Sequence, residues 1–480
     1  MWWIPTSGVG VLIVAFVAVI FIRTLLFVPK KNKIGDTSPV FVNSEKAVSD
    51  LAEMIRCKTV SHTDPSLDDE SEFEKFERLL PALFPKIHST CLFEKVGERS
   101  LLFKWSGKCH DAPTVLMSHY DVVSVEEENW EKPAFEGIIE NGVLWGRGTL
   151  DTKGNLNGIL QAAETLIGEG FIPEQDIYFA FGGDEEVGGT GAVKIVELFK
   201  ARGIIPGAVI DEGGAVASGI FPGVRKPCAV IGIAEKGMLN MEYSVKGGGG
   251  HASSPDPITP IGRLARACVR VEKHTFKYRL TKPTKELFNT VGRHSTFFYR
   301  LLFANRWCFS PILALYARKS GGEFNAVVRT TTAFTQMEGS KGMNVIPPYA
   351  RMVSNQRIIP GETVESLAAE IEKAVGDKKV NCKVIDGMSP SVISDTNCEA
   401  WERLRATVSE TWQDAIVTPY LMVACSDSRH WGVITDKIYR FSPMALSKEE
   451  RGTIHGNNER IPLATVAEAV EFYIRLIKKS

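Results

Sequence analysis

The stretch "QDIYFAFGGDEEVGGTGAVKIVELFKARGIIPGAVIDEGG", residues 175–214, contains the pattern that decides the fold. An apolar strand pattern comes first, a helical pattern follows over residues 190–203, and a second apolar strand pattern ends the stretch. Apolar strands separated by a helix are typical of a parallel sheet with helices on its faces. Two adjacent glutamates, Glu185 and Glu186, stand between glycines where the first strand ends.

The same alternation continues upstream, where "PTVLMSHYDVV" (residues 113–123) has the pattern of a buried strand and residues 151–170 have that of a helix. The pattern changes near Lys236 to a β-α-β-β-α-β order, which is the ferredoxin-like arrangement. We therefore predict an α/β fold with a mixed, mainly parallel sheet flanked by helices. An inserted α+β ferredoxin-like domain is expected to serve as a lid or dimerisation domain.

The predicted domains follow from these pattern changes. They are an N-terminal hydrophobic anchor at residues 1–33, a main domain in two parts at 44–236 and 388–480, and the inserted domain at 237–387. The insert also contains an aromatic-rich helical stretch, Phe288–Tyr316. That stretch is expected to cover an acyl chain, to touch a membrane, or to pack inside the lid or a dimer interface.

The N-terminal segment differs from the rest of the chain because Val9–Val28 is almost wholly apolar. This is about the 20 residues that a helix needs to cross a bilayer. A cleaved signal peptide carries basic residues before its apolar run, whereas here the basic cluster "KKNK", residues 30–33, follows it. We expect a retained single-pass anchor, with a cleaved signal peptide and a buried soluble helix as alternatives.

The composition argues against several classes of protein. Lys and Arg total 56 against 57 Asp and Glu, which gives a net charge of −1 and no basic footprint for nucleic acid. The nine cysteines form no C-x-x-C pair, and no G-x-S-x-G elbow is present, which argues against a zinc ribbon and a serine hydrolase. A small-molecule or short-peptide substrate is favoured.

Polar residues that suit metal binding follow the predicted strands. Because the carboxyl ends of parallel strands meet at one sheet edge, we expect these side chains to converge there. Histidines and carboxylates are zinc ligands, and a two-metal site needs a shared ligand. Taken singly, each has an ordinary explanation, such as a helix cap or a solvated loop. The residues are His119, Asp121, Asp151, Glu185, Glu186, Asp211, Glu212 and His455.

Seven motifs in order carry a family resemblance over roughly residues 44–477: "MSHYDVV", "WGRGTLDTKG", "GGDEEVGGTG", "VIDEGG", "GGHASSP", "NVIPP" and "IHGNNERI". The chain resembles the dizinc metallopeptidase and amidohydrolase family of aminoacylase, acetylornithine deacetylase and glutamate carboxypeptidase. The last motif and "SDSRHW" are most similar to the carboxypeptidase S branch, which includes the N-fatty-acyl-amino-acid synthase/hydrolases.

The resemblance implies two zinc ions per chain, bridged by Asp151 and a water or hydroxide. One ion would be held by His119 and Asp211, and the other by Glu186 and His455. Asp121 would orient His119 from behind, as metal-bound histidines usually require.

The resemblance also implies the residues that act on the substrate. Glu185 would take a proton from the water and deliver it to the leaving nitrogen. His251 would be the lid histidine that stabilises the oxyanion, supplied by the other subunit of a homodimer. Arg429 would meet a substrate carboxylate, or else form a surface salt bridge. Two lid asparagines would lie near the substrate or hydrogen-bond at turns, namely Asn325 and Asn344.

Two departures from the family pattern leave the substrate open. Relatives commonly carry glycine before the Asp-Ser-Arg run, where this chain has Ala424 and Cys425. Thr152 follows the bridging aspartate where many relatives have a second acidic residue. The first change is expected to narrow the pocket near a substrate carboxylate.

The resulting functional prediction is a zinc-dependent hydrolase that cleaves the amide bond of N-acyl amino acids, including N-fatty-acyl ones, in a reversible reaction. Carboxypeptidase or dipeptidase action on short peptides is the alternative. A non-catalytic, membrane-tethered binding protein is the alternative of a different class, although all five ligands and Glu185 are present.

The predicted location is a membrane-anchored protein facing the secretory lumen or the extracellular side, because the branch is typically lumenal or secreted. The basic residues after the apolar run favour a cytoplasmic domain instead. Secretion after signal cleavage is a further alternative.

Overall fold

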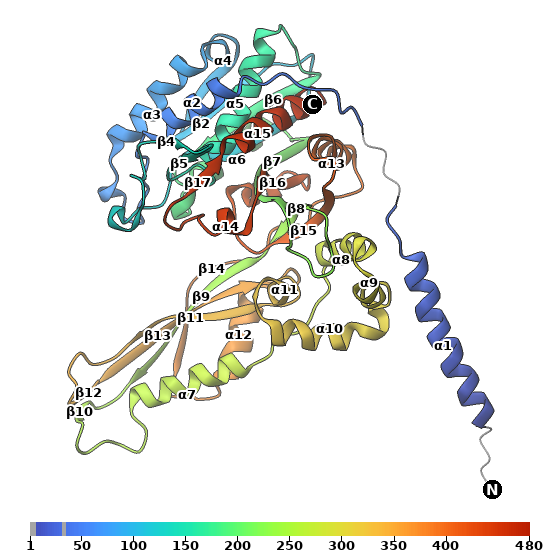
Figure 1. The fold of residues 1–480 in the computed structure, drawn as a ribbon. Helices are drawn as coiled ribbons and strands as arrows, with labels where there is room; N and C mark the ends of the chain where they lie inside the picture. The colour runs from blue at the N-terminus through green and yellow to red at the C-terminus, as the bar shows by residue number, and fades with distance from the viewer. Residues whose placement is uncertain (1–5, 31–34) are drawn as a thin grey trace.

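A computed structural model describes residues 6–30 and 35–480 of the chain. Residues 1–5 and 31–33 of the predicted N-terminal segment, and with them most of the basic cluster, lie outside the described residues. Helix α1 (Thr6–Leu26) stands at the side of the molecule, away from the main sheet (Figure 1). Its window Val9–Leu26 is long and apolar enough to cross a membrane, with a mean hydropathy of 2.8.

The main sheet has eight strands. The neighbouring strands β6, β3, β7 and β16 run parallel, so their carboxyl ends meet at one edge, while the outer pairs include antiparallel ones. The predicted mixed sheet is confirmed. In spatial order the strands are β1 (Leu92–Val96), β2 (Ser100–Trp105), β6 (Gln175–Gly182), β3 (Cys109–His119), β7 (Ala208–Ala217), β16 (Ile438–Leu446), β8 (Cys228–Glu235) and β15 (Ile416–Met422).

Helices cover both faces of this sheet (Figure 1). The central helix α5 is buried on nearly every side, and a Cβ at Gly158 would lie 3.2 Å from the ring of Tyr473, so α5 and α15 approach closely. The helices of this domain are α2 (Ser44–Ile55), α3 (Glu70–Leu83), α4 (Pro85–Thr90), α5 (Lys153–Gly168), α6 (Gly191–Ala201), α13 (Glu399–Thr411), α14 (Lys448–Arg451) and α15 (Leu463–Ile477). A small sheet joins β4 (Ile138–Glu140), β5 (Val143–Trp145) and β17 (Arg460–Pro462).

The lid has its own four-stranded antiparallel sheet in the order β11-β13-β9-β14, with two helices packed on it. This is the predicted ferredoxin-like arrangement. The elements are β9 (Gly237–Lys246), α7 (Pro260–Lys273), β11 (Thr331–Glu338), β13 (Tyr349–Ile358), α12 (Val364–Val375) and β14 (Asn381–Met388). The short strands β10 (Gly250–His251) and β12 (Val345–Ile346) pair at the end of the lid farthest from the main domain (Figure 1).

A helical insert follows α7 and does not join the lid sheet. It consists of α8 (Lys282–His294), α9 (Phe297–Ala304), α10 (Arg306–Ser320) and α11 (Gly322–Ala326). Residues of α8 share an apolar cluster with Tyr420 and Met422 of β15, so this part of the predicted 237–387 domain packs against the main sheet. The domain boundaries stay a prediction.

Candidate metal centre

Asp121 ties together two parts of the site that are far apart in the sequence. His119 is the buried last residue of β3, and its Nδ1 lies 3.0 Å from the backbone oxygen of Asp121. The Asp121 carboxylate accepts hydrogen bonds from the backbone N–H groups of Glu185 (3.2 Å) and Glu186 (3.1 Å) and from Ser61 Oγ (2.7 Å). This arrangement leaves Nε2 of His119 facing the site.

Asp151 lies between the two histidines. Its Oδ1 is 3.0 Å from Nε2 of His119, and its Oδ2 is 3.0 Å from Nε2 of His455. The two histidines come from the two separate sequence segments of the main domain, and the single carboxylate of Asp151 faces both of them. This is the arrangement expected of a carboxylate shared by two metal ions.

The turn that carries Asp151 is held by the buried residue Glu459. This residue belongs to the motif "IHGNNERI", but nothing in the sequence singled it out as a site residue. Its carboxylate accepts from the backbone N–H groups of Leu150 (2.7 Å), Gly148 (3.1 Å) and Asp151 (3.3 Å). It also pairs with Arg147 at 2.6 Å. Glu459 therefore fixes the position of the shared carboxylate from behind.

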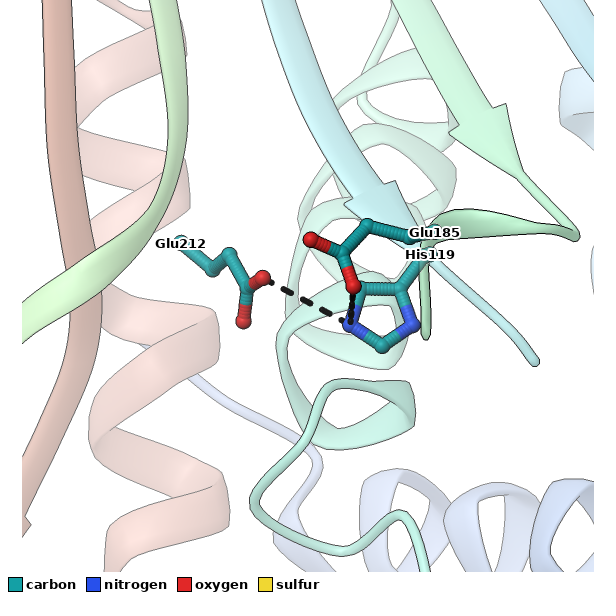
Figure 2. A group of neighbouring side chains, drawn as sticks. All are labelled: His119, Glu185 and Glu212. Atoms are coloured by element: carbon teal, nitrogen blue, oxygen red, sulfur yellow. Dashed lines mark ion pairs between the residues drawn. The ribbon is translucent and has the colours of Figure 1, made fainter. Parts of the chain in front are cut away.

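Three glutamates complete the site. Glu186 Oε2 lies 3.1 Å from Nε2 of His455, and Glu186 Oε1 is buried with no hydrogen-bond partner. Figure 2 shows the carboxylates of Glu212 and Glu185 both directed at the same ring nitrogen of His119, with Oε1 of Glu212 at 3.5 Å and Oε2 of Glu185 at 3.9 Å from Nε2. Two groups able to hold a cation result, one of His119, Glu185 and Glu212 and one of His119, Asp151 and Glu186.

Asp211 is not brought into either group. Its Oδ2 accepts a hydrogen bond from the backbone N–H of Ser428 at 3.1 Å. Successive side chains of a strand point to opposite faces, so only one of two adjacent acids can reach the site. Of these two acids, Glu212 lies 3.5 Å from Nε2 of His119, and the predicted ligand Asp211 forms no such pair among the described residues.

The site concentrates negative charge. Burial raises the pKa values of Glu185 and Glu212 well above the ordinary range, and the charge of a neighbouring carboxylate raises each further. Burial lowers the pKa of His119, but the carboxylates around it outweigh that effect and raise it. A hydrogen bond to Asp151 raises the pKa of His455 to about 10. Carboxylates crowded in this way are stabilised by a cation.

The donor set and its spacing fit zinc. Two ligand atoms that each lie 2.0–2.1 Å from a tetrahedral ion are roughly 3.3 Å apart. Four carboxylate oxygens near the Nε2 atoms of His119 and His455 lie at 3.0, 3.5, 3.0 and 3.1 Å from them. The unpartnered oxygen of Glu186 adds a free acceptor at the same place.

The predicted lid residues do not gather at this centre within one chain. His251 is exposed on β10, with its Nδ1 2.7 Å from Ser253 Oγ. Asn344 is beside it, since its backbone oxygen accepts from Ala252 N–H at 2.9 Å. Asn325 lies in α11, where it lines a separate lid cavity with a volume of about 590 Å³.

Arg429 is neither a surface residue nor free. Its Nη1 lies 3.2 Å from Oε2 of Glu235, and its Nη2 donates to the backbone oxygen of Ser389 at 2.6 Å. Glu235 is fully buried and also pairs with the fully buried Arg440. The surface salt bridge considered from the sequence is therefore a buried network, and the guanidinium already has a carboxylate partner.

Replacing Glu235 by glutamine is expected to lower the free energy of unfolding by about 3–5 kcal/mol, because two buried guanidinium groups lose the carboxylate that pairs with both of them among the described residues. The free energy is measured by urea titration of the purified protein. Asp414→Asn, which removes an exposed partner of Lys226 at 3.8 Å, is the control and should cost about 1 kcal/mol or less. Equal losses in the two variants would contradict the central role of Glu235.

Comparisons with known proteins identify the family. Residues 115–479 match the family described as Peptidase family M20/M25/M40. The chain is 34% identical to a protein named probable carboxypeptidase S-like 2 of Dictyostelium discoideum, over 98% of this chain and 93% of that one. It is 35% identical to the N-fatty-acyl-amino acid synthase/hydrolase PM20D1 of Xenopus tropicalis, again over 98% and 93%.

A solved structure of similar fold is that of an M20 family metallo-carboxypeptidase, Sso-CP2 from Sulfolobus solfataricus. The two structures superpose with a TM-score of 0.66 at 15% identity, covering 90% of this chain and 98% of that one. At this identity the likeness supports the fold alone.

Proposed function

Because the chain belongs to peptidase family M20/M25/M40 and is a hydrolase of that family, we propose that it is zinc-dependent and cleaves the amide bond of N-acyl amino acids. The observation that carries the proposal is Asp151, whose two oxygens each lie 3.0 Å from a different histidine. A shared carboxylate between two histidines suits a pair of ions that act on one carbonyl.

The proposed ligands are His119 and Glu212 for one ion and Glu186 and His455 for the other, with Asp151 and a water or hydroxide shared. Glu212 replaces Asp211 in this assignment because only Glu212 lies near a histidine nitrogen. Zinc ions bound there would polarise the substrate carbonyl and lower the pKa of a bound water.

The remaining roles belong to side chains of the chain itself. Glu185 accepts a proton from the attacking water and delivers it to the leaving nitrogen, for which a buried carboxyl group beside the ligands is suited. Asp121 positions both His119 and the turn that carries the two glutamates, so it acts through these residues rather than on the substrate.

The substrate class is supported by the relatives, one of which is named an N-fatty-acyl-amino acid synthase/hydrolase, while a buried apolar cluster packs next to the proposed ligands. Met422 packs so closely on Gly213, the residue after Glu212, that a Cβ there would lie 2.7 Å from its Sδ. Met422 belongs to a cluster that also contains Phe288 and Tyr420. These side chains are at most 7% exposed, so the cluster supports the backbone beside Glu212. Short peptides remain the second candidate because the Dictyostelium relative is named as a carboxypeptidase.

We also propose that the enzyme works as a homodimer and is held in a membrane of the secretory pathway by α1. His251 and Asn344 lie together at the outer end of the lid, where they suit the site of a second subunit. The apolar window of α1 supports the anchor.

The proposal is tested on the full-length protein purified in detergent, by measuring bound metal and turnover of an N-oleoyl amino acid, an N-acetyl amino acid and a panel of dipeptides. We expect about two zinc ions per chain and preferred hydrolysis of the N-oleoyl substrate. Preference for dipeptides would favour the second candidate. Absence of both metal and turnover would leave a non-catalytic binding protein.

The ligand assignment predicts different results for two neighbouring acids. Glu212→Gln should release about one metal ion per chain, because glutamine is a much weaker zinc ligand. Asp211→Asn should keep both ions, since Asp211 accepts a backbone hydrogen bond instead. Metal content per chain decides the matter, and loss of metal in Asp211→Asn alone would restore the assignment made from the sequence.

A further inference from the structure

Helix α1 is not an isolated anchor, because it packs along α9 and α10 of the helical insert. The ring of Phe16 lies 5.6 Å from that of Trp307, and the ring of Phe21 lies 6.2 Å from that of Phe297. Near the carboxyl end of α1, Arg23 donates to the backbone oxygen of Ala304 at 3.1 Å. The contacts therefore extend over much of the apolar window of α1.

A buried polar contact holds the two parts together. Asn305, at the junction of α9 and α10, is fully buried and donates to the backbone oxygen of Ile20 (3.2 Å) and to Thr24 Oγ1 (3.1 Å). Thr24 is also fully buried. Side-chain hydrogen bonds of this kind join helices inside membranes. Removal of α1 would leave Asn305 without these partners, which favours a retained helix.

The face of α9 and α10 that continues this packing is apolar and uncovered. Its large side chains are between 47% and 66% exposed, a degree of exposure that marks an interaction site when such residues are contiguous. Figure 1 shows α9 and α10 on the same side of the molecule as α1. The residues are Phe297, Phe298, Trp307, Ile312, Leu315 and Tyr316.

The position of the Phe16–Trp307 contact along α1 indicates what covers the apolar face of α9 and α10. Phe16 lies ten residues before Leu26, the end of the apolar window, which corresponds to about 15 Å along a helix. That is roughly half of a hydrocarbon core about 30 Å thick. A bilayer crossed by α1 must therefore also surround whatever packs beside Phe16, including Trp307.

We propose that α9 and α10 enter the lipid bilayer beside α1, so that Phe298, Trp307 and Leu315 contact lipid acyl chains. The arginines of this region fit that setting, because they donate to backbone oxygens as charged residues in membranes do. Arg300 donates to Ser295 and Arg306 to Phe303, each at 3.1 Å. The basic pair Arg318 and Lys319 ends α10, where it can reach lipid headgroups.

The test uses the full-length chain in phosphatidylcholine vesicles that contain a clickable lipid. The photoreactive residue p-benzoyl-phenylalanine replaces Phe298 or Leu315, one variant at a time. Leu12 of α1, 71% exposed, is the matched position expected to meet lipid, and Ile205 of the main domain, 64% exposed, is the position expected to meet water. Lipid adducts are counted by mass spectrometry after irradiation.

We expect adduct yields at residues 298 and 315 that are similar to that at residue 12 and at least about tenfold above that at residue 205. Adducts at residue 12 alone would overturn the proposal, as would crosslinks to a second copy of the chain at 298 and 315. A lack of adducts at residue 12 would overturn its premise. Turnover of a water-soluble N-acetyl substrate, measured on each variant, separates these outcomes from a failure of the proposed hydrolase.

Discussion

Replacing Glu185 by glutamine is expected to lower kcat by about 10²–10⁴-fold, the usual contribution of a general acid or base, with both metal ions still bound. Glutamine keeps the shape of the side chain but cannot accept and return a proton. The structure places Glu185 Oε2 3.9 Å from Nε2 of His119, farther than Asp151 and Glu212. Glu185 therefore lies beside these two proposed ligands but is farther from this nitrogen than they are.

Glu186→Gln is the matched control, since it changes the adjacent residue in the same way. Glu186 lies 3.1 Å from His455, and we expect its replacement to lower metal content as well as kcat. Both variants are assayed for turnover and for zinc per chain by elemental mass spectrometry. If Glu185→Gln loses as much metal as Glu186→Gln, then Glu185 is a ligand and another residue must move the proton.

The positions of most site residues were predictable because they depend on one topological rule. His119, Asp121, Glu185 and Glu186 follow predicted parallel strands, and the carboxyl ends of β3 and β6 do lie side by side. Asp151 directly precedes Thr152, the N-cap residue of α5, and from the sequence an ordinary role as a helix cap was equally compatible with this place. The sheet order brings these residues together.

The choice between Asp211 and Glu212 was not predictable in the same way. Both acids lie within β7, just after the residues that pair with β3, and a shift of one residue exchanges the face to which each points. The strand register in which the backbone of Asp211 lies opposite Arg440 of β16 fixes these faces, and Arg440 is more than 200 residues away in the sequence. Local pattern contains no information on such a contact.

Buried partners from distant segments explain the other differences. Glu235 meets Arg429 across 194 positions, and Glu459 reaches the turn before Asp151 across more than 300. The local sequence around each of these glutamates shows nothing unusual. Only tertiary packing reveals that the carboxylate is buried and which groups it binds. The helical insert is similar, because from the sequence its aromatic stretch was compatible with an acyl chain, a membrane, the lid or a dimer interface, and its contacts with α1 join segments 285 positions apart.

Replacing His251 by alanine is expected to lower kcat by about 10²–10³-fold, the cost of removing one donor to the developing oxyanion. Within one chain His251 cannot have this role, since β10 lies at the end of the lid away from the main sheet (Figure 1). The expected loss therefore requires a second subunit that places its lid end over the metal centre. Ser253, whose Oγ lies 2.7 Å from Nδ1 of His251, leaves Nε2 free to donate.

Co-expression of two inactive variants tests that requirement more sharply than the single substitution. One chain carries Glu185→Gln and the other His251→Ala, with different affinity tags so that mixed dimers can be isolated. In a mixed dimer one of the two centres combines an intact Glu185 with the intact His251 of the other chain. Because the dimer has twofold symmetry, about half of the wild-type kcat per dimer should return. A mixed dimer as inactive as the Glu185→Gln and His251→Ala homodimers would show that His251 does not act on the centre of the other chain. A wild-type rate in the His251→Ala homodimer would show that His251 has no role in catalysis.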